Sequence, residues 1–417
     1  MSVRSFLATI KTQLETSKGP LRFVTGNQSA DLDSVISAIS YSYFSNLKDK
    51  NEYIIPLINI PREDLKLRRD IVSVLSAHSI SEDLLYFVED FARLTKSQTK
   101  TELVLVDHCN LQGDILTDAY QQKRLEVVAI IDHHADEGIA LDAKPRIVHS
   151  NGSCSSLVFN YWYDCIGEKT EFYKDIDVIS LLLAPLLIDT SNMTQKVEEG
   201  DEVAFAKYKE ILNLPGNKTL TDLESSEGAV TTKLVATEDN IFERFYTKTK
   251  SEKKNVKGFS VSDLLRKDYK QFEFQAKKSA IRIGFSSLSK AMSWILSTYT
   301  HDEVVAACID VCKINDLDVI VMTPSYTRKD NDEYTREFAY SFNKDSKNAE
   351  FFHQLAELTS PVLELNDNVY SLDKAELSQI NNNKHNQVLE IYNQVNIRAS
   401  RKQVVPAVKD VVEAADI

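Results

Sequence analysis

The sequence predicts an α/β protein with a parallel-sheet domain in its N-terminal half and a smaller α/β domain in its C-terminal half. Three observations predict this class. Strand-like and helix-like segments alternate from Leu21 to about Leu212, as they do where helical crossovers join parallel strands. The strand-like segments carry Val, Ile and Leu on both faces, as a buried parallel sheet requires. A second set of strand-like and helix-like segments follows Lys257.

The N-terminal elements are predicted from the spacing of apolar residues. Short runs rich in Val, Ile and Leu indicate strands, and apolar positions about 3.6 residues apart indicate helices. The predicted strands are Leu21–Thr25, Tyr53–Ile60, Leu103–Val106 and Val127–Ile131. The predicted helices are Ser34–Leu47, Ser81–Leu94, Ser155–Ile166 and Val203–Leu212.

Breaks in this pattern predict the domain boundaries. The polar stretch from Leu214 to Thr219 interrupts the alternation, and the lysine-rich stretch from Lys248 to Lys257 is expected to be weakly structured. We therefore predict a first domain over residues 1–212, a linker over residues 213–230 and a second domain over residues 231–417. In the second domain the predicted strands are Ile281–Phe285, Val319–Met322 and Phe338–Phe342, and the predicted helices are His301–Lys313 and Ala349–Leu358.

Charge and composition argue against several classes of protein. The 417 residues include 49 Lys and Arg against 62 Asp and Glu, and the net charge of −13 argues against a nucleic-acid partner that needs a basic surface. The apolar runs are too short and too interrupted to cross a membrane, and the first residues lack the apolar region of a signal peptide. The five cysteines form neither a paired framework nor a CxxC motif. We expect a cytoplasmic monomer that binds neither nucleic acid nor membrane.

Acidic residues stand at the ends of several strand-like or apolar runs in the N-terminal half. They are Asp31 and Asp33 after the first strand, Asp107 after the third, Asp132-His133-His134 after the fourth, and Asp189 after the run Leu181–Ile188. The carboxyl ends of parallel strands line one crevice of an open α/β sheet, so acids placed there by separate strands are expected to converge. Four acidic ends of this kind predict a metal site.

Two divalent ions are the expected occupants of this site. Asp31 and Asp33 can each bind one ion, and Asp107 can bridge both. His133 supplies a nitrogen ligand and Asp189 a further oxygen. Two ions about 3.5–4 Å apart can hold a hydroxide nucleophile and neutralise phosphoryl oxygens during in-line displacement. The predicted reaction is hydrolysis of a phosphoanhydride or phosphoester.

Each of these residues also has a structural interpretation when it is taken alone. Asp31 or Asp33 could serve as a helix N-cap or in a turn, and Asp189 could cap the turn that follows it. Adjacent histidines at a strand end are harder to explain in this way, because neighbouring strand residues point to opposite faces. For the constellation as a whole, a functional role is favoured.

The order of these residues resembles the four motifs of the DHH phosphoesterase superfamily. The matching segments are Asn27-x-x-x-Asp31-x-Asp33-Ser34, Asp107-His108, Asp132-His133-His134 and Asp189. Lys267–Phe272 and Ala399–Pro406 resemble substrate-binding segments of the C-terminal domain shared by manganese-dependent family II inorganic pyrophosphatases, prune proteins and fungal cytosolic exopolyphosphatases. The resemblance spans nearly the whole chain. Its length, the run Leu57–Leu65 and the Gly26-Asn27 start are most similar to yeast-type exopolyphosphatases.

The resemblance implies a function and a role for each matching residue. The implied activity is hydrolysis of terminal phosphoanhydride bonds of inorganic polyphosphate, with release of orthophosphate, in the cleft between the two domains. The implied metal ligands are Asp31, Asp33, Asp107, His133 and Asp189. The implied catalytic residues are Asp107 and His134, where His134 contacts the phosphoryl group or protonates the leaving oxygen. The implied substrate-binding residues are Asn27, His134, Lys270, Arg401 and Lys402, with Arg401 and Lys402 alternatives for one family position.

Asn27 is a departure from the pyrophosphatases, which carry a histidine at this position. An amide oxygen in place of an imidazole nitrogen makes the site harder, which favours Mg²⁺ relative to Mn²⁺. We therefore expect two ions, Mg²⁺ in preference, with Mn²⁺ or Co²⁺ as alternatives. Asn27 could instead only close a turn after Gly26.

Other functions remain open at this point. A manganese-dependent family II pyrophosphatase would share the metal chemistry but is typically shorter. A prune-like protein would hydrolyse short polyphosphates or nucleotides weakly and act mainly as a binding partner, although prune-like chains often lack the double histidine present here. A non-catalytic scaffold stabilised by metal is the remaining alternative.

The basic residues are interpreted in two ways. Lys270, Arg401 and Lys402 could simply solvate a surface, as most Lys and Arg do. A net-acidic protein that binds phosphates must nevertheless concentrate such cations, which supports the clamp. The run Arg62, Lys66, Arg68 and Arg69 could extend a track for a longer polyanion, but its interleaved acids favour an ordinary charged helix face.

Overall fold

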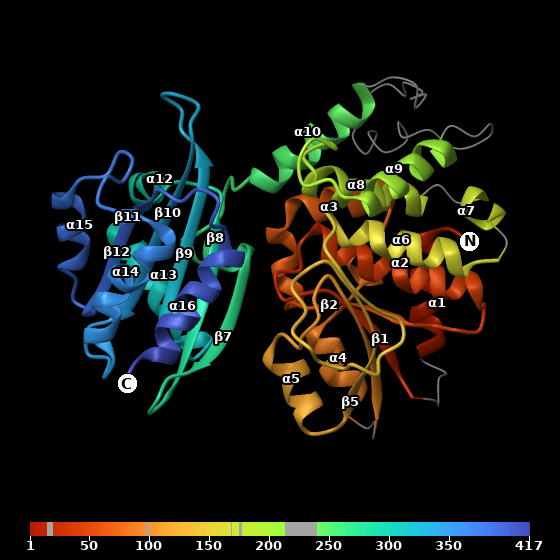
Figure 1. The fold of residues 1–417 in the computed structure, drawn as a ribbon, viewed down its shortest axis with the longest axis horizontal. Helices are drawn as coiled ribbons and strands as arrows, with labels where there is room; N and C mark the ends of the chain where they lie inside the picture. The colour runs from red at the N-terminus through yellow and green to blue at the C-terminus, as the bar shows by residue number, and fades with distance from the viewer. Residues whose placement is uncertain (15–19, 97–99, 168, 175–176, 213–239) are drawn as a thin grey trace. The chain divides into compact units, whose positions relative to one another are not determined.

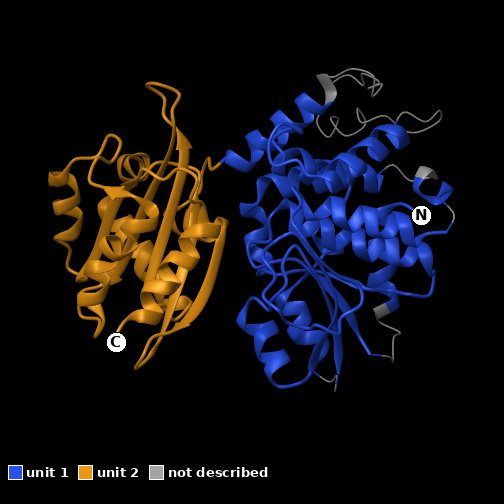
Figure 2. Ribbon diagram, viewed as in Figure 1, with its two compact units in different colours: residues 1–255 blue, residues 256–417 orange. Residues whose placement is uncertain are grey.

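The computed structural model describes residues 1–14, 20–96, 100–167, 169–174, 177–212 and 240–417. These residues form two compact units, unit 1 (residues 1–255) and unit 2 (residues 256–417) (Figure 2). The predicted linker, including the polar stretch at 214–219, lies outside the described residues. The predicted domain boundaries therefore stay a prediction.

A parallel sheet lies at the centre of unit 1 (Figure 1). Among the described residues it has six strands in the order β3-β2-β1-β4-β5-β6, and all neighbours are parallel. The strand order reverses between β1 and β4, and ligands of such sheets bind beyond the carboxyl ends of the strands at this switch point. The strands are β1 (Arg22–Thr25), β2 (Ile55–Ile58), β3 (Tyr86–Phe87), β4 (Thr101–Val106), β5 (Leu125–Asp132) and β6 (Arg146–Val148).

Helices pack on this sheet and against one another. Helix α2 contacts β1 and β2, and it also packs against α6 and α8. Phe44 of α2, Phe159 of α6 and Phe172 of α7 pack ring against ring in this core. The helices are α1 (Val3–Leu14), α2 (Leu32–Lys48), α3 (Arg69–Ala77), α4 (Val88–Thr95), α5 (Asp114–Gln121), α6 (Cys154–Cys165), α7 (Thr170–Lys174), α8 (Asp177–Asp189), α9 (Glu199–Leu212) and α10 (Asn240–Lys254).

All four strands predicted for the N-terminal half are confirmed, as β1, β2, β4 and β5, and three of its four helices are confirmed as α2, α6 and α9. The apolar run Leu181–Ile188 belongs to a helix, α8, although it reads equally well as a strand. Every residue of α8 from Val178 to Leu187 is buried, so the run has no polar face to reveal the helical period. None of the helices in the described ranges is long and apolar enough to cross a membrane.

Two predictions of local structure are wrong. The segment Ser81–Leu94 is not one helix but a 3₁₀ turn (Glu82–Leu84), the edge strand β3 and helix α4, because Tyr86 and Phe87 pair with β2. The lysine-rich stretch that begins at Lys248 is helical through Lys254, as the end of α10. Tertiary packing stabilises this helix, which lies against α3 and α8 and buries Phe242.

Unit 2 contains a mixed sheet in the order β11-β12-β10-β9-β8-β7 among its described residues. Only β8 and β9 of these neighbours are parallel. The three predicted strands lie within β8, β9 and β10, and the two predicted helices are confirmed as α13 and α14. The strands are β7 (Tyr269–Gln275), β8 (Ala280–Leu288), β9 (Val319–Thr327), β10 (Tyr334–Asn343), β11 (Leu365–Asn366) and β12 (Gln387–Gln394). The helices are α11 (Val261–Lys267), α12 (Met292–Thr298), α13 (His301–Ile314), α14 (Ala349–Leu363), α15 (Lys374–Asn381) and α16 (Arg401–Ala414).

Candidate metal centre

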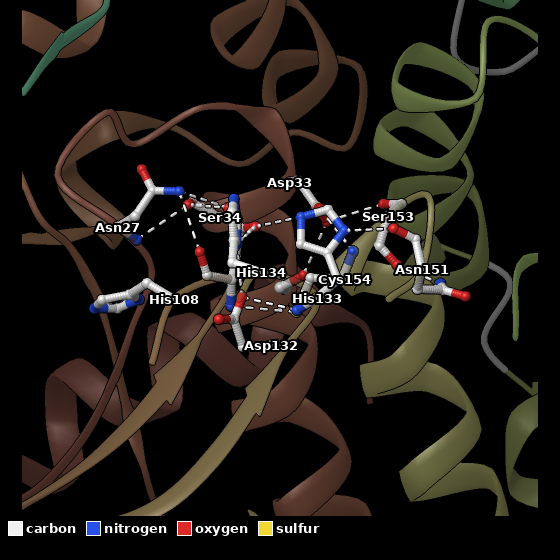
Figure 3. Close-up of polar contacts among 12 residues, drawn as sticks. Asn27, Asp33, Ser34, His108, Asp132, His133, His134, Asn151, Ser153 and Cys154 are labelled. Atoms are coloured by element: carbon white, nitrogen blue, oxygen red, sulfur yellow. Dashed lines mark hydrogen bonds and ion pairs between the residues drawn. The ribbon is translucent and has the colours of Figure 1, made fainter. Parts of the chain in front are cut away.

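Polar residues from separate segments of unit 1 meet beyond the carboxyl ends of β1, β4 and β5 (Figure 3). Asp107 directly follows β4, and His133 and His134 directly follow β5. One ligand atom from each of these three residues lies within 4.8 Å of the others, which makes them a candidate metal-binding group. Asp107 and His133 are thus brought together as predicted, and His134 joins them.

Asp107 is the centre of this group. It is buried and has a backbone φ of +59°, a left-handed conformation that is unfavourable for a residue other than glycine. Its Oδ1 lies 3.1 Å from His133 Nε2 and 3.8 Å from His134 Nδ1. Its Oδ2 accepts hydrogen bonds from Asn27 Nδ2 at 2.7 Å and from Ser34 Oγ at 2.6 Å. The fold holds this carboxylate in one orientation from both sides.

The Asp107 carboxyl remains ionised despite its burial. Burial raises its pKa, but the hydrogen bond from His133, the charges of His134 and His133, and the Ser34 hydroxyl outweigh burial. Together they hold the pKa of Asp107 well below its usual range. A metal ligand must be deprotonated, so Asp107 is prepared to bind a cation.

Each histidine is oriented by a partner on its Nδ1. His133 Nδ1 donates to the backbone carbonyl of Asn151 at 2.9 Å, which leaves Nε2 facing Asp107. His134 Nδ1 lies 2.7 Å from Oδ1 of Asp132, a fully buried residue. Metal-binding histidines characteristically make such contacts to a carbonyl or carboxylate. The orienting role of Asp132 was not predicted, although Asp132-His133-His134 are contiguous in the sequence.

Asp31 and Asp33 lie at the start of α2. Asp31 is the N-cap of this helix and accepts from Ser34 N at 3.1 Å, so the structural interpretation considered for it is realised. Asp33 is buried, and its carboxylate receives hydrogen bonds from the N-terminus of α6. Those donors are Cys154 N at 2.7 Å, Ser155 N at 2.8 Å and Ser153 Oγ at 3.0 Å.

Asp189 is the last residue of α8, not the end of a strand. Its Oδ2 is buried and has no hydrogen-bond partner among the described residues. Burial raises the pKa of Asp189 to about 7, against the opposing charge of Lys253, and the charge of Asp31 adds to the rise. Burial also raises the pKa of Asp33 well above its usual range, and the charges of Asp107 and Asp189 raise it further.

Buried carboxylates that repel one another, together with an oriented imidazole, are donors that fit a divalent cation. The carboxylates of Asp31, Asp33 and Asp189 do not lie within 4.8 Å of the ligand atoms of all three residues, Asp107, His133 and His134. Their charges nevertheless act on the pKa values of this site. Their assignment as direct ligands stays a prediction.

Asn27 has both ends of its amide engaged. Its Nδ2 donates to Asp107, and its Oδ1 accepts from Ser29 N at 2.9 Å. In this arrangement Asn27 orients the Asp107 carboxylate, a candidate metal ligand, through its amino group. Its assignment to the substrate stays a prediction.

Arg68 was assigned to an ordinary charged helix face, and this interpretation is wrong. The side chain is buried, with 4% of the residue exposed. Its guanidinium donates to the carbonyl of Ser29 at 2.8 Å and 3.0 Å and to that of Ala30 at 3.1 Å. Arg68 therefore holds the loop between Asn27 and Asp31, a role that depends on tertiary contacts absent from the local sequence pattern.

The predicted cations of unit 2 occupy two of its elements. Arg401 begins α16, and its guanidinium donates to Asp268 O at 2.8 Å and Asp268 Oδ1 at 2.7 Å. This pair joins the two segments predicted to bind substrate, Lys267–Phe272 and Ala399–Pro406. Lys270 lies in β7 and is partly exposed, whereas Lys402 is exposed. Their contacts with substrate stay a prediction.

Two family models match the chain. The model described as "DHH family, N-terminal domain" matches residues 22–185. The model described as "DHHA2 domain" matches residues 248–411. The first match contains every predicted metal ligand except Asp189, and the second contains Lys270, Arg401 and Lys402.

Named relatives cover most or all of the chain. A Schizosaccharomyces pombe protein named "Putative exopolyphosphatase" is 31% identical over 400 residues, covering 94% of this chain and 91% of that protein. The Rattus norvegicus protein named "Exopolyphosphatase PRUNE1" is 26% identical over 418 residues, covering 99% and 80% respectively. A manganese-dependent inorganic pyrophosphatase of Methanocaldococcus jannaschii is 28% identical over 275 residues, covering 63% and 70%.

A solved structure shares the fold. The crystal structure of a Methanococcus jannaschii "putative family II inorganic pyrophosphatase" matches with a TM-score of 0.55 at 20% identity. The match covers 94% of this chain and 99% of that chain. At this identity the likeness shows a common fold.

The raised pKa of Asp189 predicts a pH-dependent metal affinity. A carboxyl group must lose its proton to bind a metal, so the apparent Mn²⁺ affinity should fall about tenfold per pH unit below the pKa of about 7. The folded metal-free protein also holds a proton that the unfolded chain, with an Asp pKa of about 3.9, has lost. Its stability should therefore fall as the pH rises from about 4 to about 7, and added Mn²⁺ should reverse this trend.

Mn²⁺ titrations and melting curves over this pH range measure both effects. Asp189→Asn cannot take up the proton and should show a flatter pH dependence of affinity. Asp142→Asn, at an exposed position in the same unit, should keep the wild-type slope. An unchanged slope in Asp189→Asn would contradict the prediction.

Proposed function

Because this chain belongs to the DHH family of phosphoesterases, we propose that it is an exopolyphosphatase, a hydrolase that releases orthophosphate from the ends of inorganic polyphosphate. The oriented group of Asp107, His133 and His134, surrounded by further buried carboxylates, carries the proposal. The relative that is 31% identical over 94% of the chain is named for the same activity. The enzyme acts on phosphoanhydride bonds and depends on a divalent metal.

The metal would be held by Asp107 and His133, with Asp31, Asp33 and Asp189 as the further proposed ligands. We propose two ions, with Mg²⁺ favoured and Mn²⁺ or Co²⁺ as alternatives. When bound, divalent ions neutralise phosphoryl oxygens and lower the pKa of water. Asp107 contributes an ionised carboxylate without having to lose a proton, and the Asn151 carbonyl keeps His133 Nε2 directed at it.

His134 is the proposed proton donor. Its Nδ1 is held by the buried carboxylate of Asp132, which fixes the orientation of the ring. The ring is edge-on to His133, at 4.5 Å between centroids and an interplanar angle of 86°. With Nδ1 fixed in this way, Nε2 can donate a proton to the oxygen that leaves with the shortened polyphosphate.

Lys270, Arg401 and Lys402 are the proposed cations for the phosphate chain. A net charge of −13 repels a polyanion, so recognition requires a local cluster of positive charge. Arg401 is pre-oriented by Asp268 and offers a planar group suited to phosphate oxygens, whereas the two lysines act as point charges.

Pyrophosphatase activity is the second candidate. The solved pyrophosphatase structure with a TM-score of 0.55 and the manganese-dependent relative support it. Asn27, at a position where the family II pyrophosphatases carry a histidine, favours the exopolyphosphatase instead. A prune-like binding role is less favoured, because both histidines are intact and oriented.

One assay separates these functions. Purified protein and Mg²⁺ are incubated with pyrophosphate, triphosphate and long-chain polyphosphate, and the products are resolved by size. We expect orthophosphate to be released from long chains from the start of the reaction, because hydrolysis at a chain end removes one phosphate at a time. Turnover of pyrophosphate alone would contradict the exopolyphosphatase, and no hydrolysis of any of the three would favour a binding protein or scaffold.

Asp107→Asn should abolish most activity while the fold is retained. Asparagine has the same shape, but it removes the negative charge at the centre of the group. We expect a loss in kcat of more than about 100-fold, beyond the range typical of residues that only support metal ligands. Asp142→Asn is the matched control at an exposed site. A folded Asp107→Asn protein with a near-normal rate would overturn the central role of Asp107.

Asn27→His should shift the metal preference toward Mn²⁺. The substitution adds an imidazole nitrogen, a donor that transition metals prefer to Mg²⁺. Measuring kcat/KM with each metal gives a Mg²⁺ to Mn²⁺ ratio that should fall in the variant, whereas the wild-type enzyme should turn over well with Mg²⁺. A strict Mn²⁺ requirement in the wild-type enzyme would refute the argument.

A further inference from the structure

Asp201, near the start of α9, is a fully buried carboxylate that the proposed chemistry does not use. It accepts five hydrogen bonds. The donors are Asn151 Nδ2 at 2.7 Å, Gly152 N at 2.7 Å, Ser153 N at 3.2 Å, Ser156 Oγ at 2.8 Å and Glu198 N at 3.0 Å. A carboxylate has about four lone-pair sites, so this group is saturated by the protein itself. Its partners show what it does.

Three of the donors belong to the loop that precedes α6, and this loop contacts the metal centre. The carbonyl of Asn151 accepts from His133 Nδ1 at 2.9 Å. Two residues further on, Ser153 Oγ donates to Asp33 at 3.0 Å. Asp201 therefore binds the loop on one side while the loop orients His133 and Asp33 on the other (Figure 3 shows the side that faces the metal centre).

The loop and the start of α9 are tightly packed against each other. A β-carbon on Gly152 would lie 2.5 Å from Lys196 O and 2.6 Å from Asp201 Oδ2. A β-carbon on Gly200 would lie 2.6 Å from Asn151 Oδ1. Since real side chains do not approach so closely, glycine at both positions allows the two segments to touch. A displacement at Asp201 must therefore displace the loop.

We propose that Asp201 is a positioning residue of the metal centre, which fixes Nε2 of His133 and the carboxylate of Asp33 through the Asn151–Cys154 loop. The inference rests on the proposed metal-dependent function. Asp201→Asn is the informative variant, because the new amino group faces hydrogen-bond donors on either side of the carboxylate. The substitution replaces hydrogen bonds to a carboxylate oxygen with repulsion between two donor groups, and it changes the side-chain volume very little.

The experiment measures Mn²⁺ affinity of the full chain by following free Mn²⁺ with electron paramagnetic resonance, at a temperature well below the melting point of each variant. Asp201→Asn should weaken Mn²⁺ binding about 10- to 100-fold, the range for residues that support metal ligands. Its kcat should fall more than its KM changes.

Asp90→Asn is the matched control. Asp90 is also a carboxylate of unit 1 that accepts from a backbone N–H, Phe87 N at 3.1 Å, at the start of α4. Its other hydrogen-bond donors are Arg62 and Arg93, and neither is a proposed metal ligand. This variant should lose stability without losing Mn²⁺ affinity. A merely structural role for Asp201 predicts the same behaviour for both variants.

The outcomes separate the inference from the proposed function. If the wild-type protein binds no Mn²⁺, the proposed function fails. If the wild-type protein binds Mn²⁺ and folded Asp201→Asn binds it equally well, only the inference is overturned. Should Asp201→Asn fail to fold, Ser156→Ala removes one donor to Asp201 and leaves the Asn151–Cys154 loop and the carbonyl that holds His133 unchanged. A weakened Mn²⁺ affinity in that variant supports the inference, and an unchanged affinity overturns it.

Discussion

The concentration of negative charge inside unit 1 is the constraint on which the rest of the site depends. Asp33, Asp107 and Asp189 are ionisable groups in one poorly solvated region, and their pKa values shift in opposite directions. Two histidines and a hydroxyl keep Asp107 ionised, whereas burial and mutual repulsion raise the pKa values of Asp33 and Asp189. A divalent cation would lower the pKa values of Asp33 and Asp189 as well, because it favours the charged form of every carboxylate around it.

The fold itself offsets part of the cost of burying these carboxylates. Asp33 lies in the first turn of α2 and accepts two backbone N–H groups at the start of α6. It therefore meets the positive ends of two helix dipoles. Asp107 is held in a left-handed conformation by the hydrogen bonds of its backbone and side chain. Such strain persists only where the surrounding structure over-determines it, and here it directs a carboxylate toward the histidines.

The sequence predicted the residues at the ends of the strands better than the residues that hold the neighbouring loops in place. Asp107 and His133 could be found because apolar runs on both faces identify buried parallel strands, and the ends of such strands converge. The helix before Asp189 could not be distinguished from a strand, since a run buried on all sides lacks a period. Arg68 and Asp201 gave no local signal, because their roles depend on backbone groups far away in the sequence that only the folded chain brings near.

The proposed metal ligands and the proposed phosphate-binding cations lie in different units. Every proposed metal ligand, and every residue that contacts one in the hydrogen bonds described above, lies within residues 1–255, that is, within unit 1. The proposed phosphate-binding cations lie within residues 256–417. In the proposal, metal binding therefore depends on the packing of unit 1, including the saturated carboxylate of Asp201 and the buried guanidinium of Arg68. The proposed phosphate-binding side chains include the exposed Lys402, which belongs to the other unit and can vary without disturbing the packing that holds the proposed metal ligands.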